Sequence, residues 1–336
     1  MDKKFRLRTL FNALFFVLLI YLTYHLIFRD QDITNIFSLI CNANKMFLLL
    51  GIFFIFMFLF MESYNVKKLL GALGNKINIL SAIKYTFIGY FFSSITPAAS
   101  GGQPVEIYCM TKDKVDGAKA TVSLLIHLCT FQFVTILTGL VCAIINYDLL
   151  KDGFIYLFIV GISLNFIALL AMVFATFSKK ITNFALNIVF IIMCGLRIKD
   201  LEKKKKNIND SLDKYHESAL FIKNNKKELL KSIVRVLIQV VFYYLAPYFI
   251  YRSFGLSEYT MLRMFSLQAV LFISVSSIPL PGAIGISEGA FLSIYRSIYG
   301  DALLGSAMLL TRFSTFYLFV IICLIVVIID ALKRKD

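Results

Sequence analysis

The sequence predicts an all-α, polytopic integral membrane protein, and three observations predict it. First, 59% of the 336 residues are hydrophobic and only 16% are charged, and the mean hydropathy is +0.79, far from the average soluble domain. Second, several apolar runs reach the roughly 20 residues that a membrane-crossing helix needs. Third, the basic residues gather in the polar segments between those runs. We therefore expect residues 1–336 to form a single membrane domain.

Six segments are long and apolar enough to be predicted as full transmembrane helices: 10–28, 46–61, 120–147, 154–177, 233–251 and 302–329. Basic residues precede the first of them, as in a signal peptide. However, this run is long, and polar residues 29–32 follow it without a small-residue cleavage pattern. We therefore interpret it as an uncleaved first span.

Two further apolar segments, 81–108 and 261–298, each contain a Pro/Gly-rich break, at 93–104 and 276–285. Backbone can leave a helix in hydrocarbon only where protein or a water-filled cavity satisfies its N–H and C=O groups. Each segment is long enough to enter the membrane, turn and return. We expect two re-entrant hairpins around an internal site; the alternative is a pair of kinked spans with no ligand.

The distribution of basic residues predicts the topology. Six crossings place both termini on one side, together with the lysines of 67–76, 112–119 and 179–231. By the positive-inside rule this side is cytoplasmic. The net charge of +15 is therefore interpreted as a topology signal and not as a nucleic-acid site.

The two broken segments are weakly alike and would have inverted topology. Each reads Ser-Ser-Ile, then prolines, then glycines, then a carboxylate, Glu106 or Glu288. The first hairpin would enter from the cytoplasm and the second from outside, and inverted pairs of this kind build midplane sites in transporters. The similarity is short, so an ancestral repeat and chance both stay open.

The chain divides into an N-terminal helix group at 1–178, a basic connector at 179–231 and a C-terminal helix group at 232–336. The connector carries apolar residues at helical spacing, which predicts an amphipathic helix with a cationic polar face. This helix is either a solvated connector or a helix on the anionic inner leaflet. The apolar segment 184–196 is too short to span and is expected to be interfacial.

Candidate ligand residues come from the breaks and from the last span. Freed amides at half-helix N-termini suit a phosphate, such as that of a phospholipid head group. A buried ionisable residue needs a partner in the membrane. We expect Arg312 to pair with Glu288 or Glu106 and to share its guanidinium with a lipid phosphate; the alternative is a fixed ion pair that only locks the helices. The predicted head-group residues are Thr96, Ser100, Gly101, Gly102, Gln103, Glu106, Gly282, Gly285, Glu288 and Arg312.

Other chemistry-bearing residues are weaker candidates. Lys84 and Arg263 can snorkel to the interfaces, and His127 is favoured as a hydrogen-bonded core histidine. The six cysteines are scattered without metal-like spacing and are interpreted as packing residues. With no P-loop in the sequence, we expect no cofactor, no metal and no catalytic residue.

The order and spacing of residues 96–106, 281–289 and Arg312 resemble the lysylphosphatidylglycerol synthase transmembrane family, also called flippase-like. The resemblance covers nearly the whole chain. It implies a prokaryotic inner-membrane protein, and we expect the bacterial cell membrane. In the best-known bifunctional members this region moves lysyl-phosphatidylglycerol to the outer leaflet, which protects cells from cationic antimicrobial peptides.

One departure from the family bears on function. Bifunctional members continue into a soluble domain that transfers lysine from lysyl-tRNA to phosphatidylglycerol, whereas this sequence ends at Asp336, just after the last span. We expect a translocase of phosphatidylglycerol or lysyl-phosphatidylglycerol. One alternative is a phosphatidylglycerol lysyltransferase that uses lysyl-tRNA, alone or with a separate soluble aminoacyltransferase. Another is a non-transporting scaffold, in which Glu106, Glu288 and Arg312 would tolerate loss of charge.

Overall fold

The computed structural model describes residues 38–39, 41–96, 99–150, 154–180, 182–183 and 201–333. These residues form helices and connecting turns, without strands. Five helical stretches among them are long and apolar enough to cross a membrane: Lys45–Ala72, Gly117–Ile145, Phe154–Phe177, Lys226–Ser253 and Arg296–Lys333. They match the five predicted spans after the first. The predicted span at 10–28 and the apolar segment at 184–196 lie outside the described residues.

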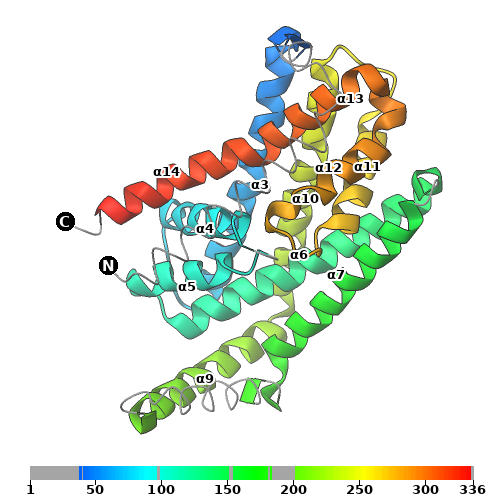
Figure 1. Cartoon of the computed structure of the whole chain (residues 1–336). Helices are drawn as coiled ribbons and strands as arrows, with labels where there is room; N and C mark the ends of the chain where they lie inside the picture. The colour runs from blue at the N-terminus through cyan, green and yellow to red at the C-terminus, as the bar shows by residue number, and fades with distance from the viewer. Residues whose placement is uncertain are drawn as a thin grey trace.

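Helices α3 (Lys45–Ala72) and α10 (Lys226–Ser253) pack along each other through the middle of the molecule (Figure 1). Gly51 of α3 faces Ile250 of α10, and a Cβ there would lie 3.4 Å from the Ile250 side chain. Asn44 caps the start of α3, with its side chain accepting from the Met46 N–H. Its own N–H donates to the Ser253 carbonyl at the end of α10 (2.8 Å). The two helix ends are therefore joined directly.

Helices α6 (Gly117–Ile145) and α7 (Phe154–Phe177) form a second antiparallel pair, linked by η2 (Tyr147–Leu150) and packed on α11 (Met261–Val275). The outer face of α7 exposes large apolar side chains: Tyr156, Ile159, Val160, Phe166, Ile167 and Phe174. An exposed apolar face of this size is expected for a helix that faces lipid.

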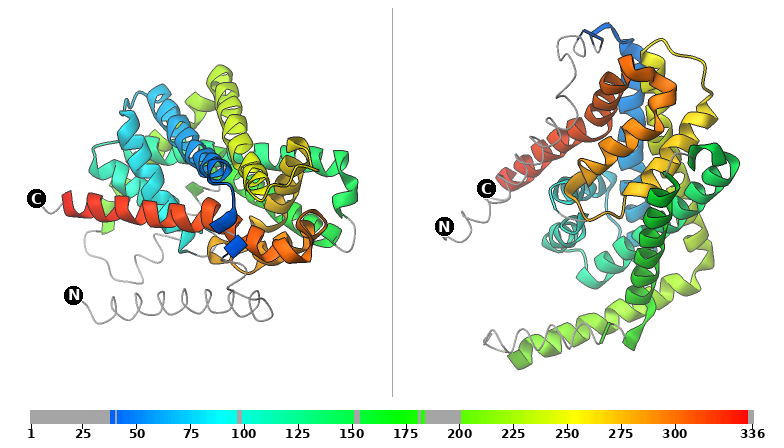
Figure 2. Two further views of the ribbon diagram at one scale, coloured as in Figure 1. Left: turned by 90° about the horizontal axis from the view of Figure 1, so that it is seen from above. Right: turned by 45° about the vertical axis from the view of Figure 1, so that its right-hand side comes forward.

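Helix α9 (Leu201–Asn224) lies across one end of the bundle, and α13 (Arg296–Arg312) lies at the opposite end (Figure 2). The predicted amphipathic helix therefore forms. Its buried residues Tyr215, Ala219 and Ile222 pack against α3 and α6, and the Tyr215 hydroxyl donates to the Ala175 carbonyl of α7 (2.8 Å). Other helices therefore cover the apolar stripe of α9. Neither a solvated connector nor a helix that contacts only the lipid leaflet would need this cover.

Both broken segments fold back as helical hairpins. The first comprises α4 (Ile79–Ser94) and α5 (Gly102–Lys112), and the second comprises α11 (Met261–Val275), the short η3 (Pro281–Ala283) and α12 (Ile286–Ile294). Tyr295 at the end of α12 donates to Gln268 in the middle of α11, so α12 returns along α11. Helix α4 contacts η3, and the two hairpins therefore meet at the second break.

The last span is not a continuous α-helix. It consists of α13 (Arg296–Arg312), a π-helical turn η4 (Phe313–Tyr317) and α14 (Leu318–Lys333). Gly300 takes a left-handed backbone with φ 63° inside α13. The π-helical turn begins directly after Arg312, and such turns often accompany functional positions in helices.

Candidate functional site

A cavity of about 270 Å³ lies where the two broken segments meet. Its wall combines residues of both hairpins with residues of α3, α10 and the last span. Most of the lining is apolar, and the polar side chains that face it include Tyr90, Ser93, Tyr243, Gln268, Thr311 and Arg312. A concave, mostly apolar space with a few polar groups is the common form of a ligand site.

Arg312 provides the cationic group of this cavity. Its Nε donates to Glu288 Oε1 (2.6 Å), and its Nη2 donates to the Gly282 carbonyl (3.0 Å). The guanidinium carbon stands 4.7 Å from the Phe316 ring centroid, which adds a cation–π contact. The side chain keeps 14% of its surface exposed. Arg312 is therefore held by the second break while part of its surface faces the cavity.

Glu288 binds both Arg312 and the backbone of the break. Its Oε2 accepts from the Gly285 N–H (2.6 Å) and from the Ser287 hydroxyl (3.0 Å). It is the third residue of α12, where the positive end of the helix dipole favours a carboxylate. Only 1% of its side chain is exposed. Of the two partners expected for Arg312, the structure therefore selects Glu288.

Glycines give the second break its backbone path. Gly282 and Gly285 have φ values of 58° and 88°, in the left-handed region that other residues enter at a cost. A Cβ at Gly282 would also lie 2.4 Å from the Phe316 ring. Gly282 therefore lets its own carbonyl reach Arg312 while the ring of Phe316 packs against it.

Asn165 of α7 supports the second break, and it was missed by the sequence analysis. Its amide Nδ2 donates to the Ile273 carbonyl near the end of α11 (2.9 Å) and to the Gly161 carbonyl (2.8 Å), and its Oδ1 accepts from the Ser276 hydroxyl (3.1 Å). A Cβ at Gly161 would lie 2.5 Å from the Ile273 carbonyl oxygen. The sequence did contain a signal for this role: a lone Asn four residues after a Gly in an apolar helix. A buried amide in a span needs hydrogen-bond partners, so such an Asn indicates a contact with another helix.

The first break is closed by its own side chains. The Thr96 hydroxyl donates to the Phe92 carbonyl (2.7 Å) and accepts from the Gly101 N–H (2.9 Å), and the Ser93 hydroxyl donates to the Ala99 carbonyl (3.3 Å). Thr96 and Gly101 thus build the turn itself. Ser100 takes no part in these three hydrogen bonds, and its side chain is exposed.

Close packing of α4 on α5 depends on glycine. A Cβ at Gly102 would lie 2.0 Å from the Ser93 hydroxyl oxygen and 2.7 Å from the Gly89 carbonyl oxygen. Gln103, the next residue, is half-buried. Gly102 therefore shapes the hairpin, while the contacts assign no such role to Gln103.

Glu106 lies on the inner face of this hairpin, 4% exposed. It packs on Gly89, where a Cβ would lie 1.8 Å from its Oε1. Within the described residues no hydrogen bond or ion pair joins Glu106 to another side chain. An ionised carboxylate in hydrocarbon needs a counter-charge or water, so Glu106 differs sharply from Glu288.

A separate polar network connects α3, α6 and α10. Asn65 Nδ2 lies 3.0 Å from His127 Nδ1 and donates to the Ser232 hydroxyl (3.1 Å), while Asn65 Oδ1 accepts from Arg235 Nε (2.8 Å). Glu62 lies 3.9 Å from the other nitrogen of His127. His127 is therefore a hydrogen-bonded core residue, as favoured from the sequence, and it is absent from the lining of the central cavity.

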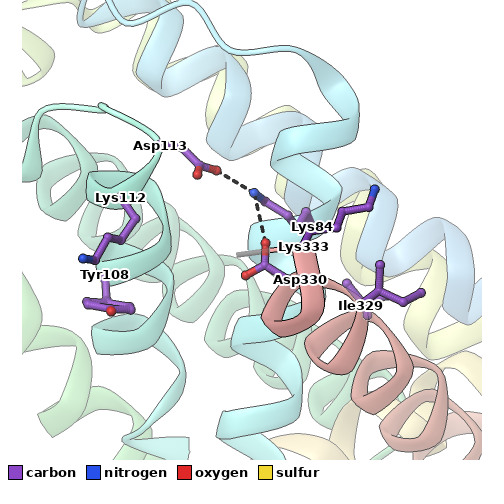
Figure 3. A pocket seen from close by; sticks show the side chains of 8 residues that line it. Lys84, Tyr108, Lys112, Asp113, Ile329, Asp330 and Lys333 are labelled. Carbon is purple, nitrogen blue, oxygen red and sulfur yellow. Dashed lines mark hydrogen bonds and ion pairs between the residues drawn. The ribbon is translucent and has the colours of Figure 1, made fainter. Parts of the chain in front are cut away.

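The two snorkelling candidates are bound to carboxylates. Lys84 bridges Asp113 (2.5 Å) and Asp330 (3.4 Å), between the first hairpin and α14 (Figure 3). These residues line a surface hollow of about 790 Å³. Arg263 pairs with Asp148 and donates to Asn146 (2.8 Å). Both therefore link helix ends, outside the central cavity.

These features define a polytopic α-helical membrane protein with two broken hairpins and a buried Arg–Glu pair beside a cavity. The family described as "Lysylphosphatidylglycerol synthase TM region" matches residues 9–323, and the chain belongs to this family. The resemblance expected from the sequence is thereby confirmed. A "UPF0104 membrane protein" of Archaeoglobus fulgidus is 22% identical over 295 residues, covering 87% of this chain and 89% of that protein. No solved structure matches the chain.

Proposed function

We propose that this protein is a lipid translocase that moves an anionic or aminoacylated phospholipid between leaflets. Phosphatidylglycerol and lysyl-phosphatidylglycerol are the substrates that the family suggests. We further propose a bacterial cell membrane with both chain termini in the cytoplasm, following the positive-inside rule. The observation that carries the proposal is Arg312, held by Glu288 and the Gly282 carbonyl at the cavity between the two hairpins.

The size and chemistry of the cavity support a head-group site. About 270 Å³ is below the roughly 300–1,000 Å³ of sites for drug-sized ligands, so the acyl chains would stay in the bilayer. An arginine guanidinium recognises phosphate by charge-assisted hydrogen bonds. The apolar remainder of the wall suits the glycerol carbons. Resistance to cationic antimicrobial peptides would follow if the substrate is lysyl-phosphatidylglycerol, because it adds positive charge to the outer leaflet.

Movement would come from rocking the N-terminal helix group against the C-terminal group around this cavity. The sequence contains no P-loop. Transport would then be passive, coupled to an ion, or driven by lipid supply on one leaflet. A coupling ion would act at Glu106, which has no bonded partner among the described residues, or at the Glu62–His127 contact.

The alternative, a phosphatidylglycerol lysyltransferase, fits the site less well. Transfer from lysyl-tRNA requires a catalytic surface that can accommodate a tRNA, whereas the central cavity has a volume of only about 270 Å³ and a mostly apolar lining. Under our proposal, a separate soluble aminoacyltransferase supplies the aminoacylated lipid.

Leaflet-resolved transport in proteoliposomes tests the proposal. Lysyl-phosphatidylglycerol and phosphatidylglycerol are followed with wild-type protein, with Arg312→Gln and with Arg263→Gln as a matched control that removes an ion-paired arginine elsewhere. We expect transport by wild type and by Arg263→Gln, and at least a tenfold loss in Arg312→Gln. Wild-type rates equal to those of empty liposomes for both lipids would contradict the proposal.

A further inference from the structure

A second hollow of about 680 Å³ lies at the end of the bundle where α3 ends and α10 begins. Its lining contains five cationic side chains and one carboxylate, together with Tyr64, Gly71, Ala72 and Ile77; the charged residues are Lys67, Lys68, Lys76, Lys231, Arg235 and Glu228. We name it the α3–α10 cleft. The central cavity shares none of these lining residues.

The only carboxylate in this lining is already engaged. Glu228 pairs with Arg235 Nη2 (2.6 Å), and Arg235 Nε donates to Asn65 (2.8 Å). The Arg235 side chain is 11% exposed, so the pair is fixed at the inner wall of the cleft. The remaining lysines therefore gain no neutralisation from Glu228.

No carboxylate among the described residues forms an ion pair with the lysines of the cleft. Lys68 places its ammonium 5.2 Å from the Tyr64 ring centroid. Among the described residues, no ion pair joins Lys67, Lys76 or Lys231 to a carboxylate. Like charges gathered in a concave, low-dielectric wall raise the local concentration of anions.

Gly71 faces open space in the cleft. A Cβ at Gly71 would meet no atom within 4 Å, so a large side chain at this position would project into unfilled space. Tyr64, Ala72 and Ile77 add apolar surface. Several ammonium groups beside an apolar wall suit an organic anion better than an inorganic ion.

The position of the cleft along α3 points to a lipid surface. The first part of α3 is apolar, and Lys67 and Lys68 begin its basic end. A basic cluster directly after a membrane span is where anionic head groups are attracted. A phosphate ester carries a full negative charge at neutral pH, so a cluster of ammonium groups attracts it.

We propose that the α3–α10 cleft is a second binding site of this protein, specific for a phosphate ester and occupied in the membrane by an anionic phospholipid head group. The lysines supply the charge, Tyr64 and Ile77 contact the glycerol carbons, and Gly71 leaves the space. Binding here does not require translocation through the central cavity. It therefore stands or falls separately from the proposed function.

Ligand binding to the purified full-length chain in detergent tests this site. The probe is dioctanoyl-phosphatidylglycerol, followed by calorimetry or native mass spectrometry in an Arg312→Gln background, which removes the central cation. The cleft variants are the triple change Lys67→Gln, Lys76→Gln, Lys231→Gln, and, separately, Gly71→Leu. The matched control is Lys214→Gln, Lys226→Gln, Lys227→Gln, which removes equal charge from exposed positions outside the cleft.

We expect at least a tenfold weaker affinity in the triple cleft variant and in Gly71→Leu, and a change within twofold in the control. Gly71→Leu blocks the space while leaving every charge in place, so its effect separates a built site from general attraction. Equal losses in the cleft and control triples, or wild-type affinity in Gly71→Leu, would overturn the proposal. Dioctanoyl-phosphatidylcholine is expected to bind weakly. Glycerol phosphate binding as tightly as the lipid would support the phosphate site and assign it to a soluble ester.

Discussion

The first and second breaks share their residue types but differ in how the structure uses them. In the second break, Glu288 is the third residue of α12 and is bound to Arg312, Gly285 and Ser287. In the first break, Glu106 lies further into α5, against Gly89. The two carboxylates therefore occupy different positions relative to the helix start, although the sequence suggested equivalence.

The breaks also differ in what satisfies their backbone. Thr96 and Ser93 close the first break from within. The second break depends on Asn165 from α7 and on Arg312 from the last span. The described hydrogen bonds of the first break thus lie within its own hairpin, whereas the second break is bonded by helices distant in sequence. Under the proposed function, this difference favours a larger role in ligand recognition for the second break than for the first.

The largest expected effect separates the two carboxylates. Glu288→Gln leaves Arg312 without its counter-charge, and breaking a buried pair costs about 3–5 kcal/mol. Glu106→Gln removes a carboxylate that has no bonded partner among the described residues, so its free energy of unfolding should stay the same or rise. Thermal unfolding in detergent measures both variants. Equal destabilisation would show that Glu106 has a hidden counter-charge.

An intermediate effect is expected from glycine substitutions in the two hairpins. Gly102→Ala forces a Cβ against Ser93 and the Gly89 carbonyl, and overpacking of this kind costs about 1–3 kcal/mol. The matched control is Gly289→Ala in α12, where a Cβ meets no atom within 4 Å. This control should gain about 0.5–1 kcal/mol, because alanine favours a helix. An unchanged free energy of unfolding in Gly102→Ala would contradict the close packing of α4 on α5.

The smallest expected effect concerns the hydrogen bonds that close each break. Thr96→Val and Asn165→Leu each remove side-chain hydrogen bonds to backbone groups, and a typical hydrogen bond contributes about 0.5–1.5 kcal/mol. Hydrogen exchange locates the damage. We expect Thr96→Val to loosen only residues around 93–102, and Asn165→Leu to loosen both α7 and the end of α11. Confinement of the Asn165→Leu effect to α7 would contradict its role in the second break.

Much of the architecture could be predicted because it depends on local composition. Apolar run length located the five spans that the structure describes, and prolines with glycines located both breaks. Because a buried charge is costly in the membrane, the sequence limited the expected partner of Arg312 to Glu288 or Glu106. Helix α9 was recognisable from its periodicity.

The remaining features depend on tertiary contacts that a single sequence does not reveal. Pairing of Asn165 with α11 joins residues 108 positions apart. Roles for Thr96, Gly101 and Gly102 as turn-forming residues emerge only from the geometry of the closed break. The α3–α10 cleft combines lysines from two helices, which the sequence analysis interpreted only as a topology signal.

Access to the central cavity from both membrane faces is the most direct test of the account. Leu280 lines the cavity at the second break, and Leu280→Cys in a cysteine-free background can be labelled by a membrane-impermeant thiol reagent added to one side at a time. We predict labelling from either side and protection by lysyl-phosphatidylglycerol or phosphatidylglycerol. Labelling from one side only, unchanged by either lipid, would contradict a translocation pathway through this cavity.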